Sequence, residues 1–192
     1  MTNPRRRIED ALARSAYTKL LCLQREAGTI EEIGRALVKA LRGGRRVFLF
    51  GNGGSAADAQ HLAAELEGRY RRERRALPVA ALTANTSTLT SVANDYGYER
   101  AFSRLVEAHV RRGDAVVAIS TSGNSPSVIE GVKRARKAGA VTIGLTGGKG
   151  GKLRGAADLC LCVPSEDTPR IQECHITVGH ILCDLIESSL FG

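Results

Sequence analysis

Apolar residues follow two alternating spacings along this chain, and the alternation predicts strands separated by helices. Short apolar runs such as "RRVFLF" and "DAVVAIS" are typical of buried parallel strands, and helix-spaced segments follow them. We therefore predict an α/β fold, with a doubly wound, mostly parallel five-stranded sheet flanked by helices. The five strands are expected at residues 45–50, 77–82, 114–120, 140–147 and 158–163.

The segment before the first strand predicts an N-terminal helical pair. Apolar residues recur at helical spacing over 8–26, and Gly28 is expected to break that helix. Thr29 and Glu32 have the spacing of a capping box, which predicts a second helix over 29–41. Both helices precede every strand, so we expect them to pack outside the sheet or across a subunit interface.

The length favours one domain. With 192 residues and no linker or repeat, the chain is expected to form a single domain over 1–192, in which residues 1–43 are an N-terminal helical extension. A final helix is predicted over 169–190, with Thr168 as its N-cap and a proline in its first position.

The net charge of +8 raises the question of a nucleic-acid partner, because the run "RYRRERR" places five arginines within residues 69–75. Aromatic residues make up only 4% of the chain and tryptophan is absent, so base-stacking platforms are not expected. We interpret the run as a solvated basic surface or a subunit contact, and a positive field would also attract a phosphorylated metabolite. No nucleic-acid partner is predicted.

No membrane partner is predicted either. Apolar runs stay well short of the ~20 residues that span a bilayer, and no signal peptide is recognised. The five cysteines form no disulfide framework, which favours a reducing, cytoplasmic location, and Cys160 and Cys162 are expected to pack in the core.

A glycine-rich turn follows the first predicted strand. The sequence "GNGGS", Gly51 to Ser55, would let backbone approach a ligand closely and would point the amides of the next helix at it. The signal is weak on its own, because glycine turns after strands are common. It matches neither a Walker loop nor the dinucleotide-binding fingerprint.

A second loop, "STSGNS" at 120–125, follows the third predicted strand. Four hydroxyl groups stand at the start of a helix whose first residue is Pro126, and a phosphate prefers short neutral donors together with free helix amides. The alternative is a serine-rich turn with Ser125 as an ordinary N-cap. The setting between strand and helix favours phosphate binding.

Histidines gather in two helical segments. His61 and Glu65 are four residues apart, so both side chains leave one face of a helix. Gln172, His175 and His180 lie on the last predicted helix. Such side chains are a plausible N/O ligand set for zinc or a similar divalent ion, although a simple surface pair at 61 and 65 stays open. Spacing alone does not say whether the two helices meet.

Four stretches together carry a family resemblance: "GNGGSAADAQHLAAELEGRY", "SVANDYGYERAFSR", "GDAVVAISTSGNSPSVIEGV" and "PRIQECHITVGHIL". In this order they resemble the sedoheptulose 7-phosphate isomerases, or phosphoheptose isomerases, of the sugar isomerase (SIS) domain family, over nearly the whole chain. The resemblance implies isomerisation of D-sedoheptulose 7-phosphate to D-glycero-D-manno-heptose 7-phosphate, the first step toward the nucleotide heptoses of lipopolysaccharide cores and capsules. It also implies a cytoplasmic homotetramer with active sites at subunit interfaces and a zinc ion in each subunit.

The resemblance also implies roles for particular residues. The catalytic acid–base pair falls on Glu65 and His180. The implied zinc ligands are His61, Glu65, Gln172 and His180. The implied substrate-binding residues are Asn52, Gly53, Gly54, Ser55, Glu65, Asn94, Asp95, Ser120, Thr121, Ser122, Ser125 and Gln172.

A second branch of the same family keeps an alternative open. Its members are tetrameric adaptors that bind the bacterial replication initiator protein, share both loops, and typically lack the Glu and final His of the catalytic pair. Glu65 and His180 are present here, which favours catalysis, whereas the tail "ILCDLIESSLF" is similar to that of the adaptors. A phosphosugar-sensing regulator is disfavoured, because no helix-turn-helix segment precedes the domain.

Overall fold

The computed structural model describes residues 3–192. They form a five-stranded sheet, in which every neighbouring pair of strands is parallel, in the order β2-β1-β3-β4-β5. The predicted fold class is confirmed, and all five strands lie within two residues of their expected bounds. The strands are β1 Val47–Gly51, β2 Val79–Ala81, β3 Ala115–Ile119, β4 Val141–Gly147 and β5 Leu159–Val163.

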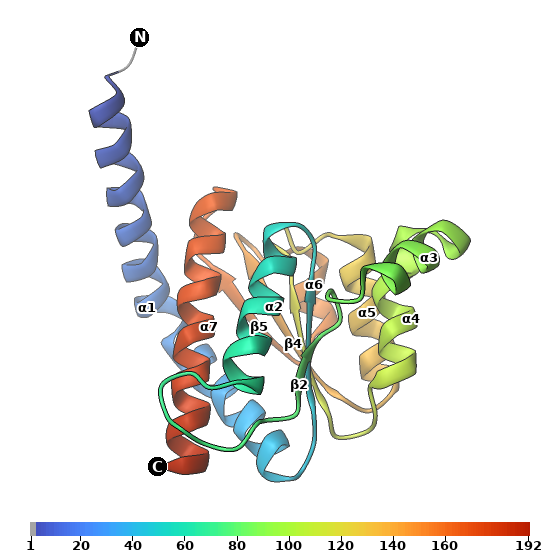
Figure 1. Cartoon of the computed structure of the whole chain (residues 1–192). Coiled ribbons are helices and arrows are strands. Elements are labelled where there is room, and N and C mark those ends of the chain that lie inside the picture. The colour runs from blue at the N-terminus through green and yellow to red at the C-terminus, as the bar shows by residue number, and fades with distance from the viewer. Residues whose placement is uncertain (1–2) are drawn as a thin grey trace.

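Helices cover both faces of the sheet (Figure 1). The longest are the first and the last, which pack side by side. A short helix between β4 and β5 escaped the sequence analysis. The helices are α1 Pro4–Arg42, α2 Gly54–Glu67, α3 Thr86–Tyr96, the 3-10 turn η1 Tyr98–Arg100, α4 Ala101–His109, α5 Pro126–Lys137, α6 Gly151–Ala156 and α7 Thr168–Phe191.

The expected N-terminal helical pair is wrong, because α1 is one continuous helix. Gly28 does not adopt a left-handed conformation, and Thr29 and Glu32 lie inside the helix rather than at its start. An interior glycine costs only about 1 kcal/mol relative to alanine. Burial of residues that follow Gly28 in the helix, such as Ile30 and Ile33, offsets that cost.

The remaining helix ends differ little from expectation. Gly43 caps the end of α1, whose last residue, Arg42, lies one position beyond the expected end at 41, and Gly44 follows with a φ of 69°. The N-cap of α7 is Asp167 rather than Thr168. The helix therefore begins one residue earlier than expected, and the proline is its second residue. An N-cap aspartate suits the positive end of a helix as well as a threonine does.

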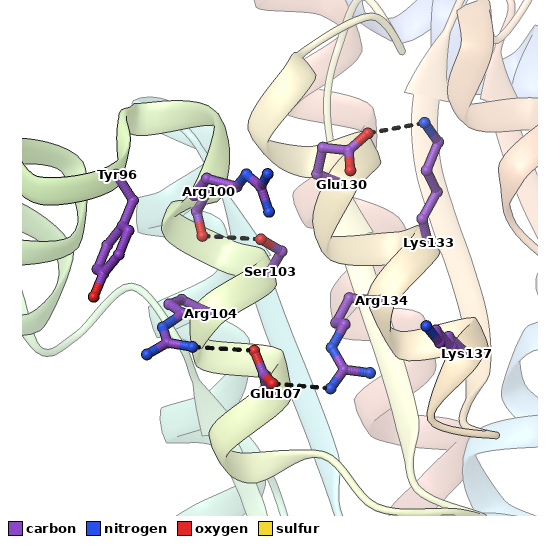
Figure 2. Close-up of a pocket in the computed structure, with 9 residues that line it drawn as sticks. All are labelled: Tyr96, Arg100, Ser103, Arg104, Glu107, Glu130, Lys133, Arg134 and Lys137. Atoms are coloured by element: carbon purple, nitrogen blue, oxygen red, sulfur yellow. Dashed lines mark hydrogen bonds and ion pairs between the residues drawn. The ribbon is translucent and has the colours of Figure 1, made fainter.

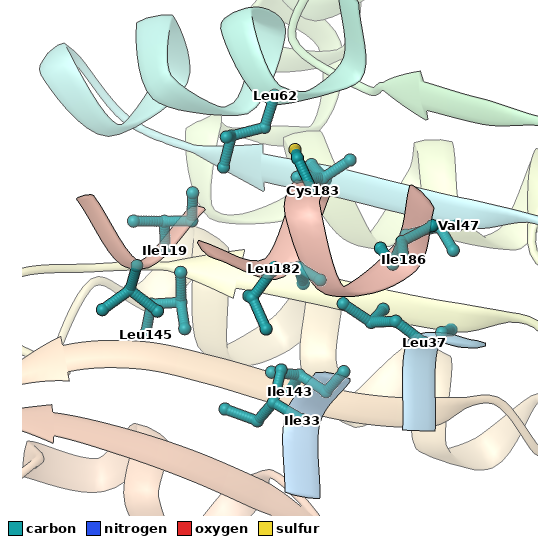
Figure 3. Packing of buried hydrophobic residues seen from close by; sticks show 14 of the residues in the cluster. Ile33, Leu37, Val47, Leu62, Ile119, Ile143, Leu145, Leu182, Cys183 and Ile186 are labelled. Atoms are coloured by element: carbon teal, nitrogen blue, oxygen red, sulfur yellow. The ribbon is translucent and has the colours of Figure 1, made fainter. Parts of the chain in front are cut away.

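The larger core lies between one face of the sheet and α1, α2 and α7 (Figure 3). Ile33 from α1, Leu62 from α2 and Ile186 from α7 converge there on strand residues such as Ile143. The other face packs against α4 and α5 through a smaller cluster that includes Phe50 and Phe102, whose rings stack 4.8 Å apart. α2 and α7, the two helices with the candidate catalytic side chains, therefore pack against the same face of the sheet.

Free cysteines line these cores. Cys22, Cys162, Cys174 and Cys183 are buried, Cys160 is partly buried, and none of the five forms a disulfide among the described residues. Burial raises the pKa of Cys160 to about 12, so this thiol stays protonated and packs as an apolar group. Cys162 is buried, as predicted, whereas Cys160 is only partly buried.

Candidate active site

The two loops singled out in the sequence leave neighbouring strands. β1 lies between β2 and β3 in the sheet. After β1 the chain continues to β2 on one side of that strand, and after β2 it crosses to β3 on the other side. This is the topological switch point of the sheet, where ligands of doubly wound folds bind at the carboxyl ends of the strands. Gly51 pairs with Ile119 at these ends, which brings the turn 51–55 beside the loop 120–125.

Asn52 joins the two loops. Its Nδ2 donates to Ser125 Oγ at 2.7 Å and to Ser127 Oγ at 3.1 Å. Its Oδ1 accepts from the hydroxyl of Tyr98 at 2.7 Å. Tyr98 was not identified from the sequence, although it stands in one of the stretches that carry the family resemblance. Asn52 is thus held from both sides, with its amide oriented by partners from η1 and α5.

The glycine turn requires its glycines. Gly53 has a φ of 55°, a conformation that side chains rarely adopt. A Cβ on Gly54 would lie 2.5 Å from Nε2 of Gln172, and one on Gly51 would lie 2.8 Å from the carbonyl oxygen of Ile119. The turn therefore brings backbone close to α7 and β3, and Gln172 lies against it. The predicted close approach of this turn to a ligand stays a prediction.

The hydroxyl groups of the loop 120–125 differ in exposure and in their hydrogen bonds. Ser125 is the N-cap of α5, yet its hydroxyl makes no capping hydrogen bond and instead accepts from Asn52. Ser122 is exposed, Thr121 is partly buried and Ser120 is buried. A hollow of about 380 Å³ opens beside the loop and is lined by Thr121, Ser122 and Lys149, among others. Hydroxyls, a helix N-terminus and a lysine together suit an anion.

His61, Glu65 and His180 form one cluster. The Nε2 atoms of His61 and His180 are 2.9 Å apart, and His61 Nε2 is 3.4 Å from a carboxylate oxygen of Glu65. One ligand atom from each of the three residues lies within 4.8 Å of the others. α2 and α7 therefore meet at the face that the spacing of His61 and Glu65 predicted.

The donor set of this cluster fits a divalent metal ion. Two ligand atoms bound to a tetrahedral zinc at ~2.0–2.1 Å lie roughly 3.3 Å apart, which is close to the spacing of the cluster. Two imidazole nitrogens and a carboxylate are also the ligand types that zinc accepts. In the part of the chain described, residues 3–192, this is the group of histidine, cysteine and acidic side chains whose geometry could hold a metal.

The other polar residues of α7 lie elsewhere. Gln172 precedes His180 by eight residues, about 12 Å along a helix, and lies at the glycine turn. The structure thus brings His61, Glu65 and His180 into one cluster, and zinc ligation by Gln172 stays a prediction.

His175 is buried away from the cluster. Its side chain is 1% exposed, and Nε2–H donates to the carbonyl oxygen of Thr146 at 3.1 Å. Its Nδ1 is buried and has no hydrogen-bond partner among the described residues. Burial lowers the pKa of His175 to about 4, so the ring is neutral. Thr146 lies one residue before the end of β4, and its hydroxyl donates to the carbonyl oxygen of Thr121 at 3.5 Å, so His175 is connected to the hydroxyl loop through Thr146.

Asn94 and Asp95 lie exposed near the end of α3. Asn94 Nδ2 donates to the carboxylate of Asp95 at 2.9 Å. From the same stretch, Tyr98 is the residue that reaches the glycine turn through Asn52. A substrate role for Asn94 and Asp95 stays a prediction.

The glycine turn and the reactive cluster are connected by one helix. Gly54 begins α2 at the loops, and His61 follows seven residues later, about 10 Å along the helix.

A separate cleft of about 540 Å³ lies on the other face of the sheet, between α4 and α5 (Figure 2). Its charged side chains largely pair with one another. Glu107 is 3.4 Å from Arg104 and 3.2 Å from Arg134, and Glu130 is 2.8 Å from Lys133. It holds none of the residues implied for catalysis.

One member of the basic run is not solvated. The side chain of Arg74 is 1% exposed and forms an ion pair with the equally buried Glu187. The interpretation of the run as a solvated surface is therefore wrong for Arg74, because the loop after α2 folds back onto α7. Arg69, Arg71, Arg72 and Arg75 are exposed.

Fold and site define a doubly wound domain with a hydroxyl-lined loop at its switch point and a cluster of two histidines and a glutamate between α2 and α7. The family model described as "SIS domain" matches residues 15–147. The phosphoheptose isomerase of Rhodospirillum rubrum is 53% identical over 186 residues, which cover 95% of this chain and 99% of the relative.

Solved structures agree with the sequence match. The phosphoheptose isomerase of Neisseria gonorrhoeae superimposes with a TM-score of 0.92 and 40% identity, and that of Francisella tularensis with a TM-score of 0.94 and 33% identity. Each alignment covers 97% of this chain and 100% of the other. The chain belongs to the SIS domain family and, within it, to the phosphoheptose isomerases.

Proposed function

We propose that the protein is an aldose–ketose isomerase that converts D-sedoheptulose 7-phosphate into D-glycero-D-manno-heptose 7-phosphate. The observation that carries this proposal is the meeting of His61, Glu65 and His180 in a member of the phosphoheptose isomerase family. The substrate carries its phosphate on the carbon farthest from its reacting end, which suits a site whose anion loop and reactive cluster are separated.

The residues of the hydroxyl loop bind the phosphate in this proposal. Ser120, Thr121, Ser122 and Ser125 donate hydroxyls, and the N-terminus of α5 supplies favourable backbone amides. Asn52, Gly53, Gly54, Ser55 and Gln172 line the sugar, and Asn94 and Asp95 join them. Gln172 is best placed to contact substrate, since it lies beside the glycine turn.

The reaction moves a carbonyl from C2 to C1 through a cis-enediolate. Glu65 removes the proton from C1 and returns it to C2, and His180 transfers a proton between the two oxygens. A hydrogen bond between the Nε2 atoms of His61 and His180 orients the His180 ring for this exchange.

His61, Glu65 and His180 would hold a zinc ion in each subunit. When bound, it would act as a Lewis acid toward the carbonyl and enediolate oxygens. Glu65 would then serve both as ligand and as base.

A homotetramer accounts for the apolar surface of α1. Ile8, Leu12, Leu20 and Leu23 are each more than half exposed, and an apolar groove of about 270 Å³ lies between α1 and α7. Within residues 3–192 the structure contains no helix long and apolar enough to cross a membrane. We propose that these side chains pack against other copies of the chain, in the cytoplasm, where the reaction begins nucleotide-heptose synthesis for lipopolysaccharide cores or capsules.

The adaptor reading is not favoured. The curated relatives at about half identity carry the name phosphoheptose isomerase, and Glu65 and His180 are both present and in one cluster.

Incubating the purified protein with sedoheptulose 7-phosphate, and following aldose formation by NMR, tests the proposal. Turnover is expected, with loss on chelation and recovery on adding zinc. Absence of turnover with and without added zinc, combined with binding to the replication initiator protein, would establish the adaptor function instead.

A further inference from the structure

A buried ion pair lies two turns beyond the reactive cluster. Glu187 follows His180 by seven residues on α7, and its carboxylate is 2.9 Å from Nε of Arg74. The two side chains are 2% and 1% exposed. A buried ion pair is often no more stable than apolar residues of the same size, so its presence calls for a reason other than stability.

Glu187 accepts hydrogen bonds from three backbone N–H groups in the loop after α2. Its Oε1 accepts from the backbone N–H of Tyr70 at 3.0 Å, and its Oε2 accepts from those of Arg71 and Arg72 at 3.0 Å each. Three successive N–H groups that converge on one anion form a nest that defines the path of the backbone. Although burial raises the pKa of Glu187, these N–H groups and Arg74 hold it below its usual range.

Arg74 connects the same anion to the end of α2. Its Nη1 donates to the carbonyl oxygen of Gly68 at 2.7 Å, and its Nη2 donates to that of Glu65 at 2.9 Å. A cation near the last carbonyls of a helix is also favoured by the helix dipole. Arg74 therefore contacts the backbone of the proposed catalytic base itself.

The loop also reaches the second catalytic side chain. The ring of Tyr70 stacks on that of His180, with ring centres 5.7 Å apart and planes inclined by 18°. The backbone N–H of Tyr70 is one of the three that Glu187 binds. Through Tyr70 and through the Glu65 carbonyl, one ion pair is linked to both members of the proposed acid–base pair.

We propose that Glu187 and Arg74 are positioning residues of the active site, which orient His180 through Tyr70 and Glu65 through the end of α2. This inference rests on the proposed function of the cluster. Apolar residues in place of Glu187 and Arg74 could fill the same space. They could not form hydrogen bonds that hold the three N–H groups and two carbonyls at defined positions.

The test compares Glu187→Gln with Asp114→Asn. Asp114 is a matched control, because its carboxylate is also buried, accepts from the backbone N–H of Arg46 and Arg111, and faces the Arg46 guanidinium. It lies just before β3, at the end of the sheet opposite the site. Both variants, together with Arg74→Lys, are assayed for kcat and KM with sedoheptulose 7-phosphate, for thermal stability, and for zinc affinity against a chromophoric chelator.

Glu187→Gln is expected to lower kcat and zinc affinity by about 10- to 100-fold, the usual effect of residues that orient metal ligands. KM is expected to change less than about threefold, because the hydroxyl loop is held by β3 and β4. Arg74→Lys keeps the charge but loses the planar fork, so an intermediate loss is expected. Asp114→Asn is expected to lose stability while keeping both kcat and zinc affinity.

Retention of kcat and zinc affinity in Glu187→Gln overturns the inference, as does an equal loss in Asp114→Asn. Should Glu187→Gln not fold, the double variant Glu187→Leu with Arg74→Leu leaves no unpaired charge, and its kcat and zinc affinity decide the matter. If the wild-type protein binds zinc without turning over the sugar, the proposed function fails while zinc affinity still tests the positioning role. If the wild-type protein turns over the sugar without zinc, kcat of the variants still tests the positioning role.

Discussion

The reactive cluster and the hydroxyl loop are built in opposite ways. The loop at 120–125 is one continuous segment between β3 and α5, whereas His61 and His180 come from helices 119 positions apart in the sequence. The loop needs only its own backbone and the adjoining helix to present donors. The cluster exists only because α2 and α7 pack on the same face of the sheet. The proposed phosphate-binding hydroxyls thus come from one short segment, while the proposed chemistry depends on tertiary packing.

Glu65→Gln should separate chemistry from binding most strongly. Removing the proposed base is expected to lower kcat by about 100- to 10,000-fold, because general bases contribute on that scale. KM should change little, since the phosphate contacts are untouched. Steady-state kinetics would measure both constants, with Glu67→Gln, an exposed neighbour on α2, as the control. Full activity in Glu65→Gln would refute its role as base.

His175→Gln tests a residue of α7 that contacts Thr146, next to the hydroxyl loop. The folded pKa of about 4 lies below the ordinary histidine value of 6.5, so the unfolded chain binds a proton that the folded chain excludes. The stability from this residue is complete above pH 6.5 and is lost as the pH falls toward 4, by about 3 kcal/mol.

Urea unfolding from pH 7.5 to 4.5, at one protein concentration, would measure the effect. The variant is expected to show a shallower fall in stability than the wild type, with kcat at pH 7.5 unchanged. Parallel stability curves for the two proteins would contradict burial of a neutral ring.

Ser125→Ala should affect binding and leave chemistry intact. The hydroxyl makes no helix-capping bond, so the free energy of unfolding should change less than the ~1 kcal/mol that a capping serine contributes. Loss of one hydrogen bond to a charged phosphate is worth about 1.5–3 kcal/mol, which corresponds to roughly a tenfold or greater rise in KM. Ser103→Ala, on α4, is the control. A clear loss of stability with unchanged KM would show that Ser125 is an ordinary cap.

Gly28→Ala gives the smallest effect and lies outside both regions. A Cβ at Gly28 would meet no atom within 4 Å, so alanine should stabilise the protein by about 0.5–1 kcal/mol without altering kcat or KM. The matched control is Gly34→Ala in the same helix, where a Cβ would lie 2.9 Å from Leu185 and should destabilise it. Destabilisation by both changes would argue against a continuous α1.

Local signals predicted most of the fold. The strands were found because a parallel sheet buried on both faces needs continuous apolar runs, and the turn at 51–55 was found because its glycines are required by backbone geometry. The break at Gly28 was wrong for a physical reason: a local cost of about 1 kcal/mol is smaller than the gain from packing α1 along α7.

The amino-acid sequence by itself determined the order of the elements, the two loops at the switch point and the pairing of His61 with Glu65 on one helix face. These depend on residues close together in the chain, whose spacing can be read directly. Only the tertiary structure placed His180 against His61, buried His175 away from them, and joined Glu187 to Arg74. Those contacts arise from how α7 packs against α2, and the register between two distant helices is set by their shared core rather than by either sequence alone.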